Sequence, residues 1–140
     1  MDQPVIRVLK IRTEVCFGDR IECAPQTYSL FREDSGGYFV RHWKMGEDEK
    51  RRSRKYEVHG RDIDPLLKKI SQLNIPASPE HVLGCDGGYT ELEIGDYGGK
   101  SSFRWWSVPP PGWEQLDEIV QGILDLLPNV ERGGPYYFGG

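Results

Sequence analysis

The side chains that could carry acid–base chemistry are few and lie far apart in the chain. The histidines are His42, His59 and His81, and none lies in a local catalytic signature. A hydrolytic site needs a nucleophile, a base and an orienting carboxylate in mutual contact. His42 and His59 fall on predicted strands that could be neighbours, so a small enzyme with a pocket assembled around them is one hypothesis. Cross-strand and surface histidines are commoner than catalytic ones, which favours a protein that is not an enzyme.

Two other patterns that enzymes use are incomplete here. Glu91 and Glu93 share one face of a predicted strand and could form an acid–base pair, but pairing with Arg104 or contact with solvent explains them more simply. The glycine-rich run 84–88 is not followed by G-K-[ST] or by a helix start, so it does not predict a phosphate loop. We therefore expect no cofactor.

Metal binding is a further possibility for the thiols. Cys16, Cys23 and Cys85, together with His81, have the ligand types that zinc prefers. No C-x-x-C pair is present, and three unclustered cysteines do not resemble a disulfide framework. Reduced, buried thiols are the simpler interpretation, and we expect no metal site.

Large aromatic residues beside charge indicate a binding surface instead. Trp106 follows Arg104 and Trp105, and an exposed tryptophan next to an arginine is typical of an interface hot spot. Strand alternation places Trp106 on the same face as Arg104, Tyr89, Glu91 and Glu93. We expect these five side chains to form one binding surface, opposite the face that contains Trp105.

The last predicted helix offers a second surface. Its outward face includes Glu114, Asp117 and Glu118 and contains no basic residue. Such a face is a candidate protein contact, although a solvated face is the simpler interpretation.

A short basic run follows an acidic one in the middle of the chain. Residues 47–49 are acidic, and Lys50–Lys55 contains five cations. This basic loop could contact nucleic-acid phosphates. A solvated hairpin tip is favoured because the run is short and the formal net charge of the chain is −4.

The elements that position these residues can be read from hydrophobic periodicity. Residues 89–94 and 100–106 alternate between apolar and polar side chains, as expected for the two strands of a hairpin. The apolar side chains of both strands share one face only if the numbers of the paired residues add up to an odd total, which we call the odd register. We predict Leu92 opposite Trp105 and Ile94 opposite Phe103.

The hairpin is followed by a corner and a helix. Pro109, Pro110 and Pro111 form the corner, and Gly112 caps the helix. The predicted buried face of this helix comprises Trp113, Leu116, Ile119, Val120, Ile123, Leu124 and Leu127.

The first part of the chain predicts four strands and a helix. Asp64 is the expected N-cap and Pro65 lies in the first turn, with Asn74 near the end. The expected strands are residues 5–15, 27–32, 38–45 and 54–59. The order ββββαββα with short connections predicts an α+β, two-layer sandwich of one mainly antiparallel sheet with both helices packed on one face.

The bulk properties limit the class of protein. With 140 residues, the chain has room for one domain, residues 1–130, followed by a flexible aromatic tail, residues 131–140. No apolar run approaches the roughly 20 residues that span a bilayer, and the first residues lack the pattern of a signal peptide. We expect a cytoplasmic protein that does not bind membranes.

One part of the sequence resembles a known group. Asp86-Gly87-Gly88, Glu91-Leu92-Glu93-Ile94, Phe103-Arg104-Trp105-Trp106 and Pro111-Gly112-Trp113 are similar to the D-G-x-x-Y-E-L-x-I … Y-R-W-W … P-x-x-W pattern of small uncharacterised bacterial proteins. Some small acidic proteins of this kind resemble immunity proteins. The resemblance covers the last third of the chain, and Thr90 replaces the tyrosine of the pattern. The resemblance implies a fold more than a function. The small size, the acidic balance, the missing catalytic signature and the aromatic and charged surface residues lead us to expect a non-catalytic, cytoplasmic protein-binding module of the immunity or inhibitor type. Such a module would neutralise a protein partner, such as a toxin, through an acidic and aromatic surface.

Overall fold

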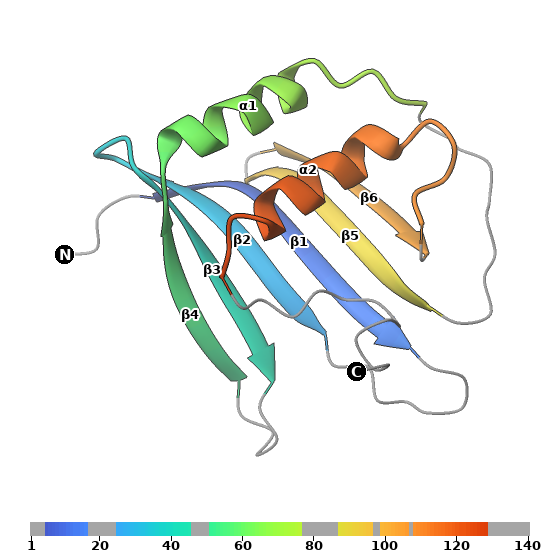
Figure 1. Cartoon of the computed structure of the whole chain (residues 1–140), viewed down its shortest axis with the longest axis horizontal. Coiled ribbons are helices and arrows are strands. Elements are labelled where there is room, and N and C mark those ends of the chain that lie inside the picture. The colour runs from blue at the N-terminus through green and yellow to red at the C-terminus, as the bar shows by residue number, and fades with distance from the viewer. Residues whose placement is uncertain are drawn as a thin grey trace.

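Six strands and two helices follow one another in the order that the sequence predicts (Figure 1). The computed structural model describes residues 5–16, 25–45, 51–76, 87–96, 99–106 and 108–128. The elements are β1 (Val5–Cys16), β2 (Gln26–Glu33), β3 (Tyr38–Met45), β4 (Arg51–Val58), α1 (Gly60–Ser71), β5 (Gly87–Asp96), β6 (Gly99–Trp106) and α2 (Glu114–Leu124).

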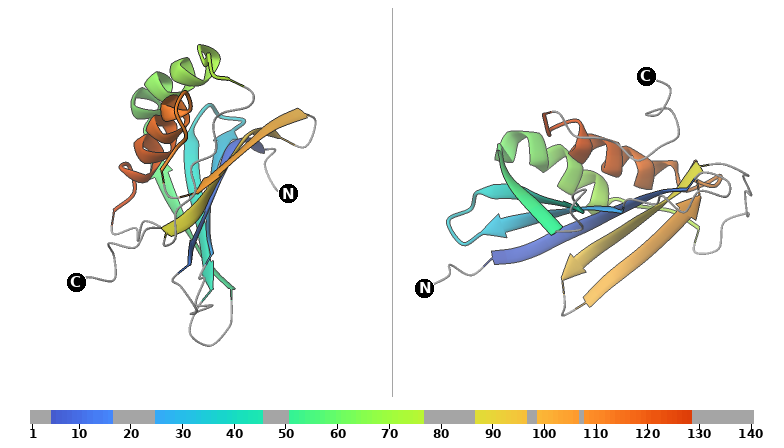
Figure 2. Two further views of the ribbon diagram at one scale, coloured as in Figure 1. Left: turned by 90° about the vertical axis from the view of Figure 1, so that its right-hand side faces the viewer. Right: turned by 90° about the horizontal axis from the view of Figure 1, so that it is seen from below.

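The strands form one antiparallel sheet in the order β4-β3-β2-β1-β5-β6. The hairpin β5–β6 therefore joins the sheet beside β1, at the far side from β4. Both helices lie on the same face of the sheet (Figure 2). This arrangement confirms the predicted α+β fold with its helices on one side.

The hydrophobic core lies between the helices and the sheet. Leu9 and Ile11 of β1 and Tyr28 and Leu30 of β2 are fully buried, and Leu92 continues this surface on β5. The predicted buried face of α2 is confirmed, because all seven of its predicted residues are buried: Trp113, Leu116, Ile119, Val120, Ile123, Leu124 and Leu127. No described helix is both long and apolar enough to cross a bilayer.

The register of the β5–β6 hairpin is odd, as predicted, but the predicted pairs are wrong by two residues. Leu92 lies opposite Phe103, Ile94 opposite Ser101 and Thr90 opposite Trp105. Both registers leave a two-residue connection, so loop length could not choose between them. In the observed register Phe103 and Trp105 both meet the ring of Trp113, with centroids 5.5 and 6.4 Å apart.

Helix α1 begins earlier than the sequence predicts. Its N-cap is His59, and Asp64 and Pro65 lie inside the helix. A proline here removes one helical hydrogen bond, but the longer helix places Ile63 on the same side as Leu66 and buries it completely. The predicted N-cap at Asp64 is therefore wrong. Helix α2 is likewise capped by Trp113, and the predicted cap Gly112 precedes it with a φ of 96°.

Candidate functional site

Neither described helix covers the second face of the sheet, which we call the open face (Figure 2). Strand alternation places every second side chain on it, because neighbouring residues of a strand point to opposite faces. The open face includes Lys10 and Arg12 of β1, Thr27 and Phe31 of β2, Phe39, Arg41 and Trp43 of β3, Arg51 and Lys55 of β4, Tyr89, Glu91 and Glu93 of β5, and Arg104 and Trp106 of β6.

Three aromatic rings on the open face each have a cation from a neighbouring strand above them. The Lys55 Nζ lies 4.4 Å from the centroid of the Phe39 ring. The Arg104 guanidinium carbon lies 3.9 Å from the Tyr89 ring. The Arg51 guanidinium carbon lies 5.2 Å from the Trp43 ring, which makes the third pair. Cation–π contacts hold these charged groups in place over an apolar base.

The first cluster is the one that the sequence predicts around Trp106. Tyr89 lies opposite Trp106, and Glu91 lies opposite Arg104. The rings of Tyr89 and Trp106 meet edge to face, with centroids 4.5 Å apart. Tyr89 is 37% exposed, whereas Trp106 is only half-buried rather than fully accessible. The Trp106 Nε1 is buried, and no described residue accepts a hydrogen bond from it.

Glu93 shares this face but is buried among cations. Only 9% of the residue is exposed. Its carboxylate oxygens lie 3.5 Å from Arg7 Nη2 and 3.4 Å from Lys100 Nζ. The Arg7 Nε also donates to the carbonyl oxygen of Gly95, at 3.3 Å. The sequence predicts Glu93 as a residue that contacts a partner, but its carboxylate is already paired with Arg7 and Lys100 of the same sheet. Glu91 is the more exposed of the two glutamates.

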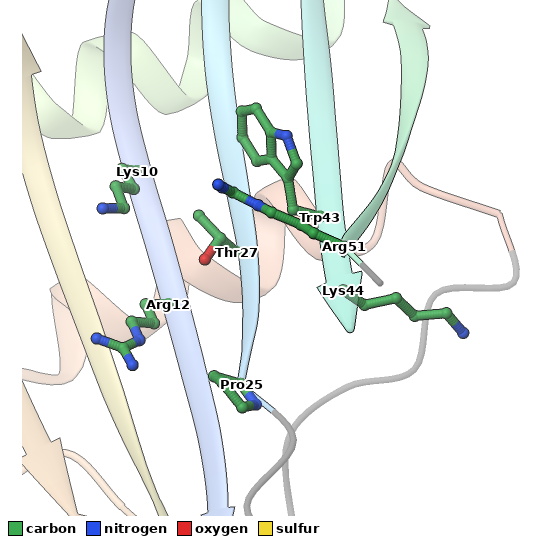
Figure 3. A pocket seen from close by; sticks show the side chains of 7 residues that line it. All are labelled: Lys10, Arg12, Pro25, Thr27, Trp43, Lys44 and Arg51. Atoms are coloured by element: carbon green, nitrogen blue, oxygen red, sulfur yellow. The ribbon is translucent and has the colours of Figure 1, made fainter. Parts of the chain in front are cut away.

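The second cluster was not recognised in the sequence. Lys10, Arg12, Thr27, Trp43 and Arg51 surround a groove of about 210 Å³ on the open face, close to the end of the β3–β4 hairpin (Figure 3). Arg12 pairs with Glu14 at 3.0 Å, and Arg51 lies across the Trp43 ring. These residues come from four strands. The alternation within each strand predicts which of its cations share a face. The sequence does not show which strands are neighbours, so it could not predict that these side chains meet in one groove.

The acidic residues of α2 lie in the helix layer, apart from the open face. Glu114 accepts a hydrogen bond from the Gly112 N–H at 2.9 Å, next to the start of the helix. Glu118 pairs with Lys69 of α1 at 3.4 Å. Burial raises the pKa of Asp117, a hydrogen bond with Gln121 opposes this, and the charge of Glu118 adds to the rise. The predicted binding residues are therefore divided between two layers and do not form one surface.

The structure does not bring His42 and His59 together. His42 is buried on β3 opposite Arg54, and His59 follows Val58, which pairs with Tyr38. At a rise of about 3.3 Å per residue, the two histidines are roughly 16 Å apart along the sheet. The pocket predicted around both of them is therefore wrong. His81 lies outside the described residues.

The basic run is a strand and not the predicted loop. Residues 51–55 belong to β4, and Lys50 lies outside the described residues. Alternation sends Arg51 and Lys55 to the open face, whereas Arg52 and Arg54 point to the helix side. The run therefore cannot act as a single basic finger, because its cations face in opposite directions.

The proposed zinc ligands are not described. Cys23, His81 and Cys85 lie outside the described residues, as does the predicted tail, and nothing is described of the Cys16 side chain. Within the described ranges, no group of three or more ligand-type side chains could hold a metal ion. No protein-family model matches this sequence, and no curated protein matches it.

Proposed function

We propose that this chain is a non-catalytic binding protein of the immunity or inhibitor type, acting in the cytoplasm, which holds an acidic surface of a protein partner against its open face. The observation that carries this proposal is the set of three aromatic rings, each beneath a cation. Such pairs offer an apolar base and a fixed positive charge at the same position. Aromatic residues and arginines are enriched among the hot spots of protein interfaces.

The charge of the open face favours an acidic partner. The chain has a formal net charge of −4, yet cations outnumber carboxylates among the described residues of this face. The cations are Arg7, Lys10, Arg12, Arg41, Arg51, Lys55, Lys100 and Arg104, and the carboxylates are Glu14, Glu33, Glu57, Glu91 and Glu93. A guanidinium group can pair with a carboxylate through two parallel hydrogen bonds. Complementary charge also accelerates association and suppresses wrong partners.

The same rings argue against single-stranded nucleic acid on this face. Proteins that bind single strands stack the bases on aromatic side chains, which requires a free ring face. Cations lie over Phe39, Trp43 and Tyr89 instead. A base would have to displace the cation before it could stack. A carboxylate of an acidic protein surface can pair with the cation without displacing it from the ring.

Co-expression with neighbouring gene products tests the proposal. Each protein encoded beside this chain's gene is expressed alone and together with the chain, and growth is measured. We expect one neighbour to arrest growth and the intact chain to restore it. Arg104→Glu should abolish the rescue, because it places a negative charge against the acidic partner. Lys68→Glu is the matched control, since it reverses an exposed charge on α1, in the other layer.

Two results would contradict the proposal. One is that no neighbour is toxic, or that the chain never restores growth. The other is that Arg104→Glu and Lys68→Glu rescue equally well while both variants remain folded by circular dichroism. In that second case the open face would not be the surface that binds the partner.

A further inference from the structure

Strand β6 forms one edge of the sheet, beyond its hairpin partner β5 (Figure 2). No described strand pairs with its outer side. The other edge strand, β4, contains Arg51, Arg52, Arg54 and Lys55, and such a row of charges is a common device that keeps a further strand away from an edge. Strand β6 has no such row, contains no proline and pairs with β5 in one continuous register. An edge of this kind can accept another strand.

The backbone groups that β6 offers at this edge follow from the register of the hairpin. Asp96 pairs with Gly99 across a two-residue connection, and the pair that closes such a turn is hydrogen-bonded. Hydrogen-bonded and non-hydrogen-bonded pairs alternate along an antiparallel ladder. Lys100, Ser102 and Arg104 therefore lie in non-hydrogen-bonded pairs, so their N–H and C=O groups point away from β5 and toward the free edge.

An apolar hollow lies beside this edge, on the helix side of the sheet. It has a volume of about 360 Å³ and lies between the end of α1 and the β5–β6 hairpin. Its apolar lining consists of five half-buried residues, which are Ile70, Leu73, Ile75, Ile94 and Phe103. The described lining contains no charged side chain. Partly exposed apolar surface beside a free edge favours a partner strand that brings a further apolar side chain to the hollow.

We infer that the occupant of this edge is a second copy of the chain, whose β6 strand pairs antiparallel with the first about a two-fold axis at Phe103. A two-fold contact uses the same residues of both copies. Phe103 then lies beside Phe103 of the second copy, so each apolar hollow gains a further aromatic ring as a neighbour. The two sheets become one continuous sheet with all helices on the same face. The contact uses the edge of the sheet, so the inference does not rest on the proposed function of the open face.

The positions of the charges select this axis. Lys100 lies opposite Trp106 of the second copy, where a cation meets an aromatic ring on the open face. Arg104 lies opposite the uncharged Ser102. An axis at Ser102 would instead place Lys100 opposite Arg104, and directly opposed like charges destabilise a sheet. The charges of β6 are therefore complementary to a second β6 strand in the register centred on Phe103.

Sedimentation velocity of the intact chain over a range of concentrations tests this inference. We expect a concentration-dependent species with twice the mass of one chain. Ser102→Pro removes an N–H that faces the free edge, where a sheet tolerates proline, and should weaken the dimer about ten-fold or more because the bond is lost twice. Ser101→Glu places a charge beside the apolar hollow and should also weaken it. Both serines are exposed, and Ser102→Ala, which keeps the N–H, is the matched control and should dimerise as the intact chain does.

Three outcomes would overturn the inference. The first is an intact chain that stays monomeric up to its highest soluble concentration. The second is a dimer that persists unchanged in Ser101→Glu, with this variant folded by circular dichroism, because another surface would then hold it together. The third is a tighter dimer in Arg104→Glu, which would place this residue opposite Lys100 and move the axis to Ser102. With the axis at Phe103, Arg104→Glu should leave the dimer unchanged although it should abolish the rescue of growth, so the two proposals can fail separately.

Discussion

Gly122 of α2 lies directly against Leu66 of α1, and the two helices approach each other at this point. A Cβ atom on Gly122 would lie 2.5 Å from the Leu66 Cδ2, closer than two carbon atoms can pack. Leu66 is itself 8% exposed and belongs to the core. A glycine inside a helix costs stability relative to alanine, so its presence here is explained by the close approach of the helices.

Gly122→Ala should therefore destabilise the fold. The gain of up to about 1 kcal/mol in helix propensity is outweighed by repacking of Leu66, and overpacking typically costs about 1–3 kcal/mol. In a Leu66→Ala background the same change should be neutral or stabilising. Urea denaturation of the single and double variants measures this coupling, and additive effects would show that the two residues do not constrain each other.

The two adjacent tryptophans should differ in their effect on stability. Trp105 is 4% exposed and meets Trp113, so Trp105→Ala should cost about 3–5 kcal/mol. Trp106→Ala loses its edge-to-face contact with Tyr89 and part of its buried area, and should cost about 1–2 kcal/mol. Chemical denaturation gives both values. A larger loss for Trp106 than for Trp105 would contradict the assignment of the two faces.

Removing Glu93 should cost more than removing Glu91 on the same face. Glu93→Ala leaves the buried Arg7 guanidinium without this carboxylate, and breaking a buried ion pair in this way costs about 3 kcal/mol or more. Glu91→Ala should change the free energy of unfolding by less than about 1 kcal/mol. The double variant Arg7→Met with Glu93→Leu should recover most of the loss. Equal losses from the two alanine variants would show that the ion pair does not contribute.

Asp117 should make the fold less stable as the pH rises. Burial raises the pKa of this carboxyl in the folded state, so the folded chain retains a proton that the unfolded chain releases. The protonated form therefore favours folding below the unfolded pKa, and this stabilisation is lost as the pH rises through the folded pKa. Asp117→Asn should be increasingly more stable than the intact chain between acidic and neutral pH. Denaturation across this range checks the trend, with Glu114→Gln as the control.

Local patterns of the sequence determined the elements and the side chains that share a face. Helical spacing identified the buried side of α2, and alternation in β5 and β6 separated Trp105 from Trp106 and gave the odd register. Both periods arise from backbone geometry within a few residues, so they can be read along the chain. Two odd registers were possible, with Leu92 opposite either Trp105 or Phe103. The choice between them depended on contacts of the hairpin with Trp113, which lies beyond it in the sequence.

Only the tertiary structure decided which strands are neighbours, and the candidate sites depend on that. Because β5 lies beside β1, Glu93 meets Arg7 and is buried rather than exposed. Because β1 and β2 lie beside β3 and β4, Lys10 and Arg12 surround a groove with Trp43 and Arg51. The pairing of strands far apart in the sequence is selected by the packing of the whole sheet beneath its helices. No local period of the sequence contains that information.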